Sequence, residues 1–322
     1  MTETQDILFE EISGHGGSIG VITLNRPAVL NSLNHDMIVA MHPKLNVWAQ
    51  AAHIKAVVIR AAEGRAFCAG GDLRLAYDRA KQHNPLMTEF FYDEYQLNRC
   101  IYHYPKPYIA LLDGITMGGG VGLSINGSHR VATDRLLFAM PETGIGFFPD
   151  VGGTYFLPRL PGLSGYYLGL TGTRIKADDC TALGLTQHKV NHDAIPALLT
   201  ALADTQFAAD ASSTVTAIIS KFNQPVLSSP LQEAQAELQA CFAGKTIEAI
   251  MELLSASSHP VCQDAVTAMQ KKSPTSLKVT LQALNQGRNT DFDVCMQQEF
   301  RLVSRFLLAH DFIEGIRAVI ID

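Results

Sequence analysis

Glycine is concentrated in the first half of this 322-residue chain. Fifteen of the 25 glycines fall within residues 1–150, whereas only three follow Gly184. Glycine permits the backbone conformations of tight turns and weakens helices. The distribution therefore predicts a first part with many tight turns and a last part built from long helices.

Apolar periodicity predicts that strands and helices alternate through the turn-rich part. Short runs rich in β-branched residues predict strands at 18–24, 56–61, 107–113 and 186–190. Helical spacing predicts helices at 34–51, 76–104, 154–170 and 176–184. Pro43 is expected to kink or shorten the first helix. Alternation of this kind requires crossover connections and predicts an α/β fold with a largely parallel, covered sheet.

Beyond residue 195 the pattern is almost wholly helical. Ser273-Pro274 has the sequence of a helix start, with a capping hydroxyl followed by proline at the first helical position. Phe292, Met296, Phe300 and later apolar residues form a stripe that we interpret as core packing and not as a ligand groove. We therefore expect a core at 1–195 and a helical region at 196–322.

Composition excludes several classes of protein. The net charge is −6, opposite to that of a protein holding many phosphates, so nucleic acid is not expected as a partner. No apolar run is long enough for a membrane span, and the acidic amino terminus resembles no signal or transit peptide. Six scattered cysteines without a CxxC motif fit reduced thiols in a cytoplasmic protein.

Two glycine clusters each follow a predicted strand. The first is FCAGGD at 67–72, and the second runs from Gly114 to Gly122 with three consecutive glycines. Bare backbone N–H groups at a helix start can bind an oxygen that gains negative charge, as an oxyanion hole does. For either cluster taken alone, glycines that serve only turns and close packing are the favoured interpretation. A phosphate-binding loop is poorly supported, because the chain contains no GxxxxGK[ST] motif.

Two carboxylates lie eight residues apart in a third segment. Glu142 and Asp150 are separated by Gly144, Gly146 and Pro149, which prevent a continuous helix, so the loop could fold both acids to one side. The segment is apolar and aromatic, and burial there would raise the pKa of a carboxyl group. Two such groups can divide the roles of general acid and general base. Taken alone, two carboxylates in a loop are more often turn caps than catalysts.

A metal site is not expected. His188 and His192 lie four residues apart but lack the glutamate of an HExxH motif. The aromatic and acidic segment FFYDEY at 90–95 is, by itself, typical of a helix face packed on the core.

In combination, these motifs resemble the enoyl-CoA hydratase/isomerase, or crotonase, superfamily. The matching segments are LNRPAVLNSLN at 24–34, GRAFCAGGD at 64–72, KPYIALLDGITMGGGVGLS at 106–124 and FAMPETGIGFFPDVGGTYFLPRL at 138–160. The segments SPTSLK at 273–278 and HDFIEGIRAVIID at 310–322 are most similar to the superfamily's 3-hydroxyisobutyryl-CoA hydrolase branch. The resemblance implies a crotonase-like spiral of ββα units with a helical C-terminal region.

The resemblance also implies site residues. The N–H groups of Gly71 and Gly119 would form the oxyanion hole, and Glu142 and Asp150 would be the catalytic acids. Glu94 matches an acid assigned to substrate contact, so Glu94, Gly119, Glu142 and Asp150 are the expected substrate-binding residues. The CoA would lie along the backbone near 28–30 and 67–71.

Two positions separate the hydrolases from the hydratases of this superfamily. Hydratases carry a second catalytic glutamate where this chain has Gly122, and glycine where it has Asp150. The resemblance thus favours hydrolysis of the thioester of 3-hydroxyisobutyryl-CoA, or a similar short 3-hydroxyacyl-CoA, in valine breakdown. A hydratase or isomerase on the same fold is the main alternative, and a non-catalytic acyl-CoA-binding protein is another.

The partners expected from the resemblance follow from this chemistry. CoA arrives as part of the acyl-CoA substrate, so neither a separate cofactor nor a metal is required. Because members of the superfamily often form trimers or dimers of trimers, a homo-oligomer is a further expectation.

Overall fold

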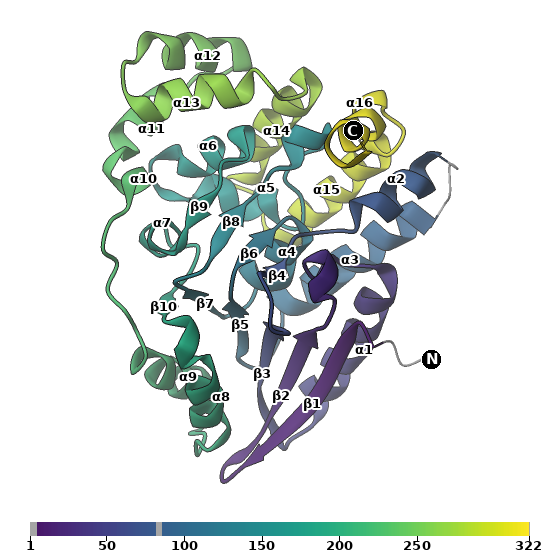
Figure 1. Ribbon diagram of the computed structural model, residues 1–322, viewed down its shortest axis with the longest axis vertical. Coiled ribbons are helices and arrows are strands. Elements are labelled where there is room, and N and C mark those ends of the chain that lie inside the picture. Colours follow the sequence, from purple (N-terminus) through teal and green to yellow (C-terminus); the bar gives the residue numbers. More distant parts are fainter. Residues whose placement is uncertain (1–4, 82–85, 322) are drawn as a thin grey trace. The chain divides into compact units, whose positions relative to one another are not determined.

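The chain, in a computed structural model that describes residues 5–81 and 86–321, divides into two compact units (Figure 1). The first unit comprises Met1–Gly71, Gln96–Phe138 and Lys176–Ser228. The second unit comprises Asp72–Tyr95, Ala139–Ile175 and Ser229–Asp322. The sequence-based boundary at residue 195 remains a prediction.

The elements confirm a mixed α/β protein with a helical C-terminal region. The strands are β1 Ile7–Gly14, β2 Gly17–Leu24, β3 Ile54–Ala61, β4 Ala66–Cys68, β5 Tyr108–Leu112, β6 Ile115–Met117, β7 His129–Thr133, β8 Leu137–Ala139, β9 Ile175–Lys176 and β10 His188–Val190. The helices are α1 His35–Gln50, α2 Leu73–Lys81, α3 Leu86–Tyr102, α4 Gly119–Ile125, α5 Gly153–Phe156, α6 Ser164–Thr171, α7 Ala177–Ala182, α8 Ile195–Ala203, α9 Ala211–Ser220, α10 Pro230–Glu233, α11 Gln235–Cys241, α12 Ile247–Ala256, α13 Pro260–Met269, α14 Pro274–Gly287, α15 Phe292–Phe306 and α16 His310–Ile316. Short 3-10 helices lie at Pro27–Val29, Glu142–Ile145, Leu157–Arg159, Pro161–Leu163 and His192–Ala194, and a π-helical segment at Arg317–Ile321.

A six-stranded sheet organises the first unit. Its order is β1-β2-β3-β5-β7-β10, with β1 antiparallel to β2 and every other pair parallel. The crossovers between parallel strands carry helices, as the alternating sequence pattern predicts. A smaller sheet has the order β4-β6-β8-β9, and its β4 and β6 run parallel.

Helices cover both faces of the six-stranded sheet. One face packs on α8 and α9 in a continuous apolar core, formed by Ile19, Val21, Ala56, Val58, Ile109, Leu111, Val131, Val190, Leu198, Leu199, Leu202, Ala203, Val215, Ile218 and Ile219. Side chains alternate along a strand, so Gly20 of β2 faces the other way, toward α1. A Cβ atom on Gly20 would lie 2.6 Å from the Trp48 ring, so this strand position has no room for a side chain.

Three sequence-based expectations differ from the observed elements. The strand β1 was not predicted, because its ILFEEISG sequence carries charged residues, which suit its place at the edge of the sheet. Pro43 does not shorten α1, which continues to Gln50. Proline leaves the carbonyl of Val39 without its helical donor, but both residues are exposed and water can replace that donor. The helix predicted at 76–104 is described as α2 and α3, and its residues 82–85 lie outside the described residues.

The second unit is mainly helical and has an aromatic centre. The Phe147 ring contacts the rings of Phe91, Phe148, Phe306 and Phe312, with centroids 4.8–5.7 Å apart. The predicted start of α14 is confirmed, because the Ser273 side chain accepts a hydrogen bond from the Ser276 N–H. This unit also holds the loop with the two predicted acids, and the aromatic centre makes its surroundings apolar.

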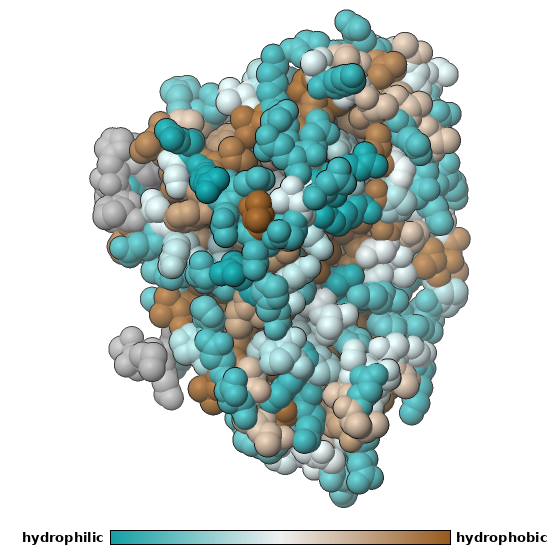
Figure 2. All heavy atoms as spheres, turned by 180° about the vertical axis from the view of Figure 1, so that it is seen from behind, coloured by the Kyte–Doolittle hydropathy of each residue, from teal (hydrophilic) through white to brown (hydrophobic). Residues whose placement is uncertain are grey.

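Among residues 5–81 and 86–321, no helix combines the length and the apolar character needed to cross a bilayer. Figure 2 shows one face of the molecule, on which hydrophobic residues are scattered in small areas among hydrophilic ones. Such scattering is ordinary for a globular surface.

We expect Gly20→Ala to destabilise the protein by about 1–3 kcal/mol, because the new methyl group would overlap the Trp48 ring. Urea unfolding measures the change. Gly64→Ala is the matched control, since its Cβ atom would meet its nearest neighbour at 3.4 Å, an ordinary contact. Equal stability of the two variants would contradict the packing described for this face of the sheet.

Candidate active site

The two glycine clusters lie side by side in the first unit. The first follows β4 and the second follows β6, and these strands pair in parallel, so their carboxyl ends meet at one edge. A Cβ atom on Gly70 would lie only 3.6 Å from the Gly119 nitrogen. A Cβ atom on Gly120 would lie 2.3 Å from the Cys68 carbonyl oxygen. Close approach of the two segments therefore requires glycine at position 120.

This arrangement leaves two backbone donors unused. Gly119 is the first residue of α4, where an N–H group has no partner inside the helix. Gly71 lies beside Leu33, whose own N–H donates to the Gly70 carbonyl at 2.8 Å. Among the described residues, the N–H groups of Gly71 and Gly119 have no hydrogen-bond acceptor. Two such donors can stabilise an oxygen that becomes negatively charged.

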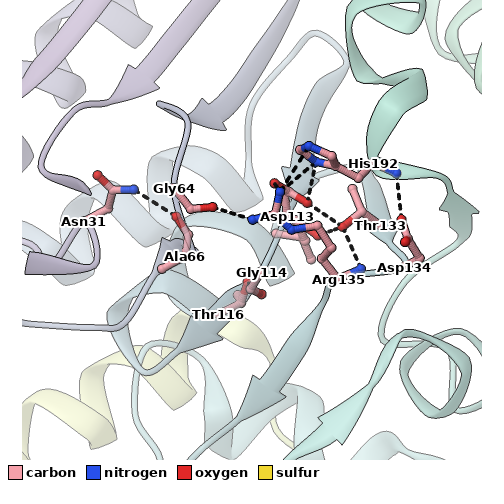
Figure 3. Close-up of polar contacts among 11 residues, drawn as sticks. Asn31, Gly64, Ala66, Asp113, Gly114, Thr116, Thr133, Asp134, Arg135 and His192 are labelled. Carbon is pink, nitrogen blue, oxygen red and sulfur yellow. Dashed lines mark hydrogen bonds and ion pairs between the residues drawn. The ribbon is translucent and has the colours of Figure 1, made fainter. Parts of the chain in front are cut away.

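The segment predicted to guide CoA lies against the first glycine cluster. The Ala69 N–H donates to the Leu30 carbonyl at 3.0 Å. The Asn31 side chain reaches across and donates to the Ala66 carbonyl at 2.9 Å (Figure 3). Leu30 and Asn31 both have a positive φ, of 55° and 53°, which turns the backbone sharply at this point. The two stretches expected along the CoA are thus neighbours in the first unit.

Charged side chains contact and stabilise the loop that leads into β4. Arg135 donates to the Gly64 carbonyl and lies 3.5 Å from the Asp113 carboxylate (Figure 3). Asp113 also accepts from the Thr133 hydroxyl at 2.7 Å and lies 3.0 Å from His192 Nδ1. These contacts hold the ends of neighbouring strands together, so we assign them a structural role.

The second unit gathers the three predicted acids. Glu94 lies on α3, Glu142 begins a 3-10 helix, and Asp150 precedes α5. Their exposed fractions are 2%, 6% and 4%. The Tyr95 hydroxyl donates to Asp150 Oδ2 at 2.7 Å, whereas Glu94 Oε1 and Glu142 Oε2 have no partner among the described residues. Unpaired buried oxygens of this kind are available to a substrate.

Burial changes the acidity of all three groups. Burial raises the pKa of Glu142 well above its usual range, the Asp150 charge raises it further, and the Lys272 ammonium opposes the rise. Burial also raises the pKa of Glu94, to which the charges of Asp150 and Glu142 add. The pKa of Asp150 rises to about 7 through burial, against the opposing effect of the Tyr95 hydroxyl. The acids of this cluster can therefore gain or lose protons near neutral pH.

Sequence reasoning missed three residues around the acids. Tyr95 belongs to the FFYDEY segment, which by itself indicated only a packed helix face. Lys272 lies near Glu142, and its Nζ atom would be 3.1 Å from a Cβ on Gly144. Glu299 lies within the apolar stripe of α15 and is fully buried. A carboxylate at an inward position of an amphipathic helix was the available signal for Glu299.

His188 and His192 each have a separate polar partner. His188 is bonded to the Asn223 side chain at 3.0 Å, and His192 lies against Asp113. Within the described ranges, no group of three or more histidine, cysteine or acidic residues is arranged to hold a metal ion.

Comparisons with known proteins place the chain among acyl-CoA enzymes. The sequence pattern of the family described as enoyl-CoA hydratase/isomerase matches residues 19–322. The chain is 43% identical to the mitochondrial 3-hydroxyisobutyryl-CoA hydrolase of Rattus norvegicus, over 100% of this chain and 83% of that protein. It is 40% identical to the protein of the same name from Homo sapiens, over 100% of this chain and 84% of that protein.

Two solved structures share the fold over nearly the whole chain. One is a carnitinyl-CoA dehydratase from Mycobacterium thermoresistibile, with a TM-score of 0.91 and 38% identity over 99% of this chain and 90% of that one. The other is an enoyl-CoA hydratase from Rhodobacter sphaeroides 2.4.1, with a TM-score of 0.89 and 35% identity over the same shares. These similarities confirm the predicted fold class.

We expect Asp150→Asn to stabilise the protein by about 2–4 kcal/mol above roughly pH 8. The carboxyl group ionises near 3.8 when unfolded and near 7 when folded. The stabilisation that comes from burying the neutral carboxyl group is therefore complete below pH 3.8, and it is lost as the pH rises through about 7. Asparagine still offers an oxygen to the Tyr95 hydroxyl.

Urea unfolding near pH 4 and near pH 8 measures this effect. The matched control is Asp264→Asn, at an exposed position on α13. A gain that is the same at both pH values, or that also occurs in the control, would contradict burial of an ionised Asp150.

Proposed function

The chain belongs to the enoyl-CoA hydratase/isomerase family, and from that premise we propose that it hydrolyses the thioester of 3-hydroxyisobutyryl-CoA. A similar short 3-hydroxyacyl-CoA would fit the same chemistry. The products are the free acid and CoA. The proposal rests chiefly on one observation, the buried cluster of Glu94, Glu142 and Asp150 in surroundings that raise their pKa values.

The position of the acids favours hydrolysis over hydration. A hydratase of this family needs a second glutamate at the position of Gly122, which lies in α4 without a side chain. This chain instead carries Asp150 within the same unit as Glu142. An acid is therefore absent where hydration requires one and present where the hydrolase branch has one.

The backbone donors of Gly71 and Gly119 suit the transition state of thioester cleavage. When a nucleophile adds to the carbonyl carbon, negative charge develops on the carbonyl oxygen. Each well-placed donor to that oxygen lowers the barrier by about 3 kcal/mol. We assign this role to the two N–H groups because neither has another acceptor among the described residues.

Glu142 has two chemically balanced routes to cleave the thioester. Its carboxylate can add to the carbonyl carbon and expel the CoA thiolate, which forms a mixed anhydride that water then hydrolyses. Alternatively, it can remove a proton from water, whose oxygen then adds to the same carbon. A raised pKa makes Glu142 a stronger base in the second route. Both routes end in the same acid and thiol.

Asp150 and Glu94 suit the 3-hydroxyl group of the substrate. Glu94 Oε1 is buried and without a partner among the described residues, so a substrate hydroxyl would satisfy it. Asp150 is kept in place by Tyr95 and has a pKa of about 7, so it can hold the hydroxyl or the attacking water in either protonation state. Its charge also raises the pKa of Glu142.

Two other functions remain as alternatives for experiment. Hydration is one alternative, because two solved relatives are named as a dehydratase and a hydratase. The absence of a side chain at Gly122 opposes it. A non-catalytic acyl-CoA-binding protein would require neither Glu142 nor Asp150, and burying either group lowers stability. The presence of both therefore favours an enzyme.

The biological setting follows from the proposed substrate. Hydrolysis of this thioester is a step in valine breakdown, and the substrate itself brings the CoA. None of the six cysteines forms a disulfide bond in the structure. A cytoplasmic location remains a prediction for this chain, whereas the named hydrolase relatives are mitochondrial.

We expect the wild type to release free thiol from 3-hydroxyisobutyryl-CoA and to leave crotonyl-CoA unhydrated. Glu142→Gln and Asp150→Asn should each lower kcat/KM by about 100-fold or more, because each removes a carboxylate that moves or holds a proton. Thiol release is followed with a thiol-reactive dye, and crotonyl-CoA hydration by the loss of its absorbance.

Glu252→Gln, at an exposed position of α12, is the control for this comparison and should keep wild-type activity. Hydration of crotonyl-CoA without thiol release would overturn the hydrolase proposal. Inactivity on both substrates, together with measurable binding of either, would favour the binding-protein alternative.

We expect Tyr95→Phe to move the acidic limb of the kcat/KM profile to higher pH by about one unit. The Tyr95 hydroxyl lowers the pKa of Asp150, so its removal raises that pKa above about 7. Tyr92→Phe is the matched control, because Tyr92 lies on the same helix but is half exposed. A profile that shifts equally in both variants would exclude the hydrogen bond as the cause.

A further inference from the structure

Glu299 is a fully buried carboxylate outside the predicted set of site residues. It lies on α15 and accepts three hydrogen bonds from the segment that follows Asp150. Glu299 Oε2 accepts from the Gly152 N–H at 2.9 Å. Glu299 Oε1 accepts from the Thr154 N–H at 2.9 Å and from the Thr154 hydroxyl at 2.6 Å. Every one of these contacts uses Glu299 as an acceptor, which suits its ionised form.

The segment that Glu299 holds is a strained turn. Val151 has a φ of 51°, a conformation that a β-branched residue rarely adopts, and Gly152 has a φ of 94°. The Gly153 N–H closes the turn by donating to the Asp150 carbonyl at 2.7 Å. Such a conformation persists only where the surroundings fix it. The Glu299 carboxylate supplies that restraint directly after Asp150.

The same helix also supports the partner of Asp150. Phe300, the residue after Glu299, packs edge-on against the Tyr95 ring, with centroids 6.3 Å apart. Tyr95 in turn donates to Asp150. One turn of α15 thus contacts both the backbone segment that follows Asp150 and the hydrogen-bond partner of this acid.

Keeping a carboxylate here is unfavourable for stability alone. Burial raises the pKa of Glu299 to about 8, in spite of the hydrogen bonds from Thr154 and Gly152 that oppose the rise. The titratable groups that share its surroundings are Tyr95, Glu142, Asp150 and Cys295. A neutral residue of similar size would avoid the desolvation of this charge. A role in the reaction accounts for the carboxylate better than a role in stability does.

We propose that Glu299 is a positioning residue for Asp150: by holding Gly152 and Thr154 it fixes the strained turn that sets the orientation of the Asp150 carboxyl group. The role rests on the proposed thioester hydrolysis, in which Asp150 holds the substrate hydroxyl or the water. Glu299 itself touches neither substrate nor reacting atoms. Above about pH 8, where Glu299 is ionised, its negative charge additionally favours the neutral form of Glu142.

Glu299→Gln tests this role with little change of shape. The amide presents one oxygen and one NH2 group, which only donates, so either orientation leaves an N–H of Gly152 or of Thr154 facing another donor. We expect kcat to fall about 10- to 100-fold, because small misplacement of a catalytic group has effects of this size. KM should change less than about threefold. Glu299 ionises near pH 8 and glutamine cannot ionise, so the variant should lack any change of kcat that follows this ionisation in the wild-type pH profile.

A second variant tests the same role from the donor side of the Thr154–Glu299 hydrogen bond. Thr154→Val retains the shape and the N–H of Thr154 and removes only the hydroxyl donor to Glu299. It should lower kcat in the same direction but by a smaller factor. Glu252→Gln on α12 is again the control. A kcat that is unchanged in both test variants would overturn the proposal.

Amide hydrogen exchange provides a readout that does not depend on activity. In Glu299→Gln we expect faster exchange at Gly152 and Thr154, with wild-type protection in the central strands. Faster exchange throughout the molecule with an unchanged pH profile would show a general structural role and overturn the proposal. If the wild type releases no thiol, the proposed function fails, and unchanged exchange at Gly152 and Thr154 would separately refute the restraint of the turn.

Discussion

Burial of several carboxyl groups in one apolar region is the constraint on which the second unit depends. Glu94, Glu142, Asp150 and Glu299 are all nearly or completely buried, and their pKa values are all raised. The Lys272 ammonium lowers the pKa of Glu142 but does not cancel the effect of burial. Groups arranged in this way do not all ionise together near neutral pH, because each charge disfavours the next. The arrangement lowers stability and makes proton transfer available.

The protein offsets this burial with specific donors instead of counter-charges. Asp150 accepts a hydrogen bond from the Tyr95 hydroxyl. Glu299 accepts hydrogen bonds from two backbone N–H groups and from the Thr154 hydroxyl. Glu94 and Glu142 each keep one oxygen without a partner among the described residues. Under the proposed function, Glu299 holds structure and Tyr95 orients Asp150. The oxygens of Glu94 and Glu142 without a partner among the described residues are left for the substrate. This division is the physical basis for assigning different roles to chemically similar side chains.

The first unit has a different requirement. Its two glycine loops must bring their backbones close together. A Cβ atom at Gly120 would overlap the Cys68 carbonyl, so the two loops approach each other only because that side chain is absent. The same approach leaves the N–H of Gly119 at the first position of α4. The backbone donors of this unit and the buried acids of the other each arise from a different property of the chain.

The sequence by itself determined the α/β class, the parallel strands, the helical C-terminal region and the motifs of the two loops. These follow from local periodicity and from glycine and proline positions, which act over a few residues. It could not determine that Tyr95 bonds Asp150, or that Glu299 bonds Gly152 and Thr154 from 145 to 147 positions away. Tertiary structure alone decided those contacts, because the pKa and the orientation of a buried acid depend on which groups the fold packs around it.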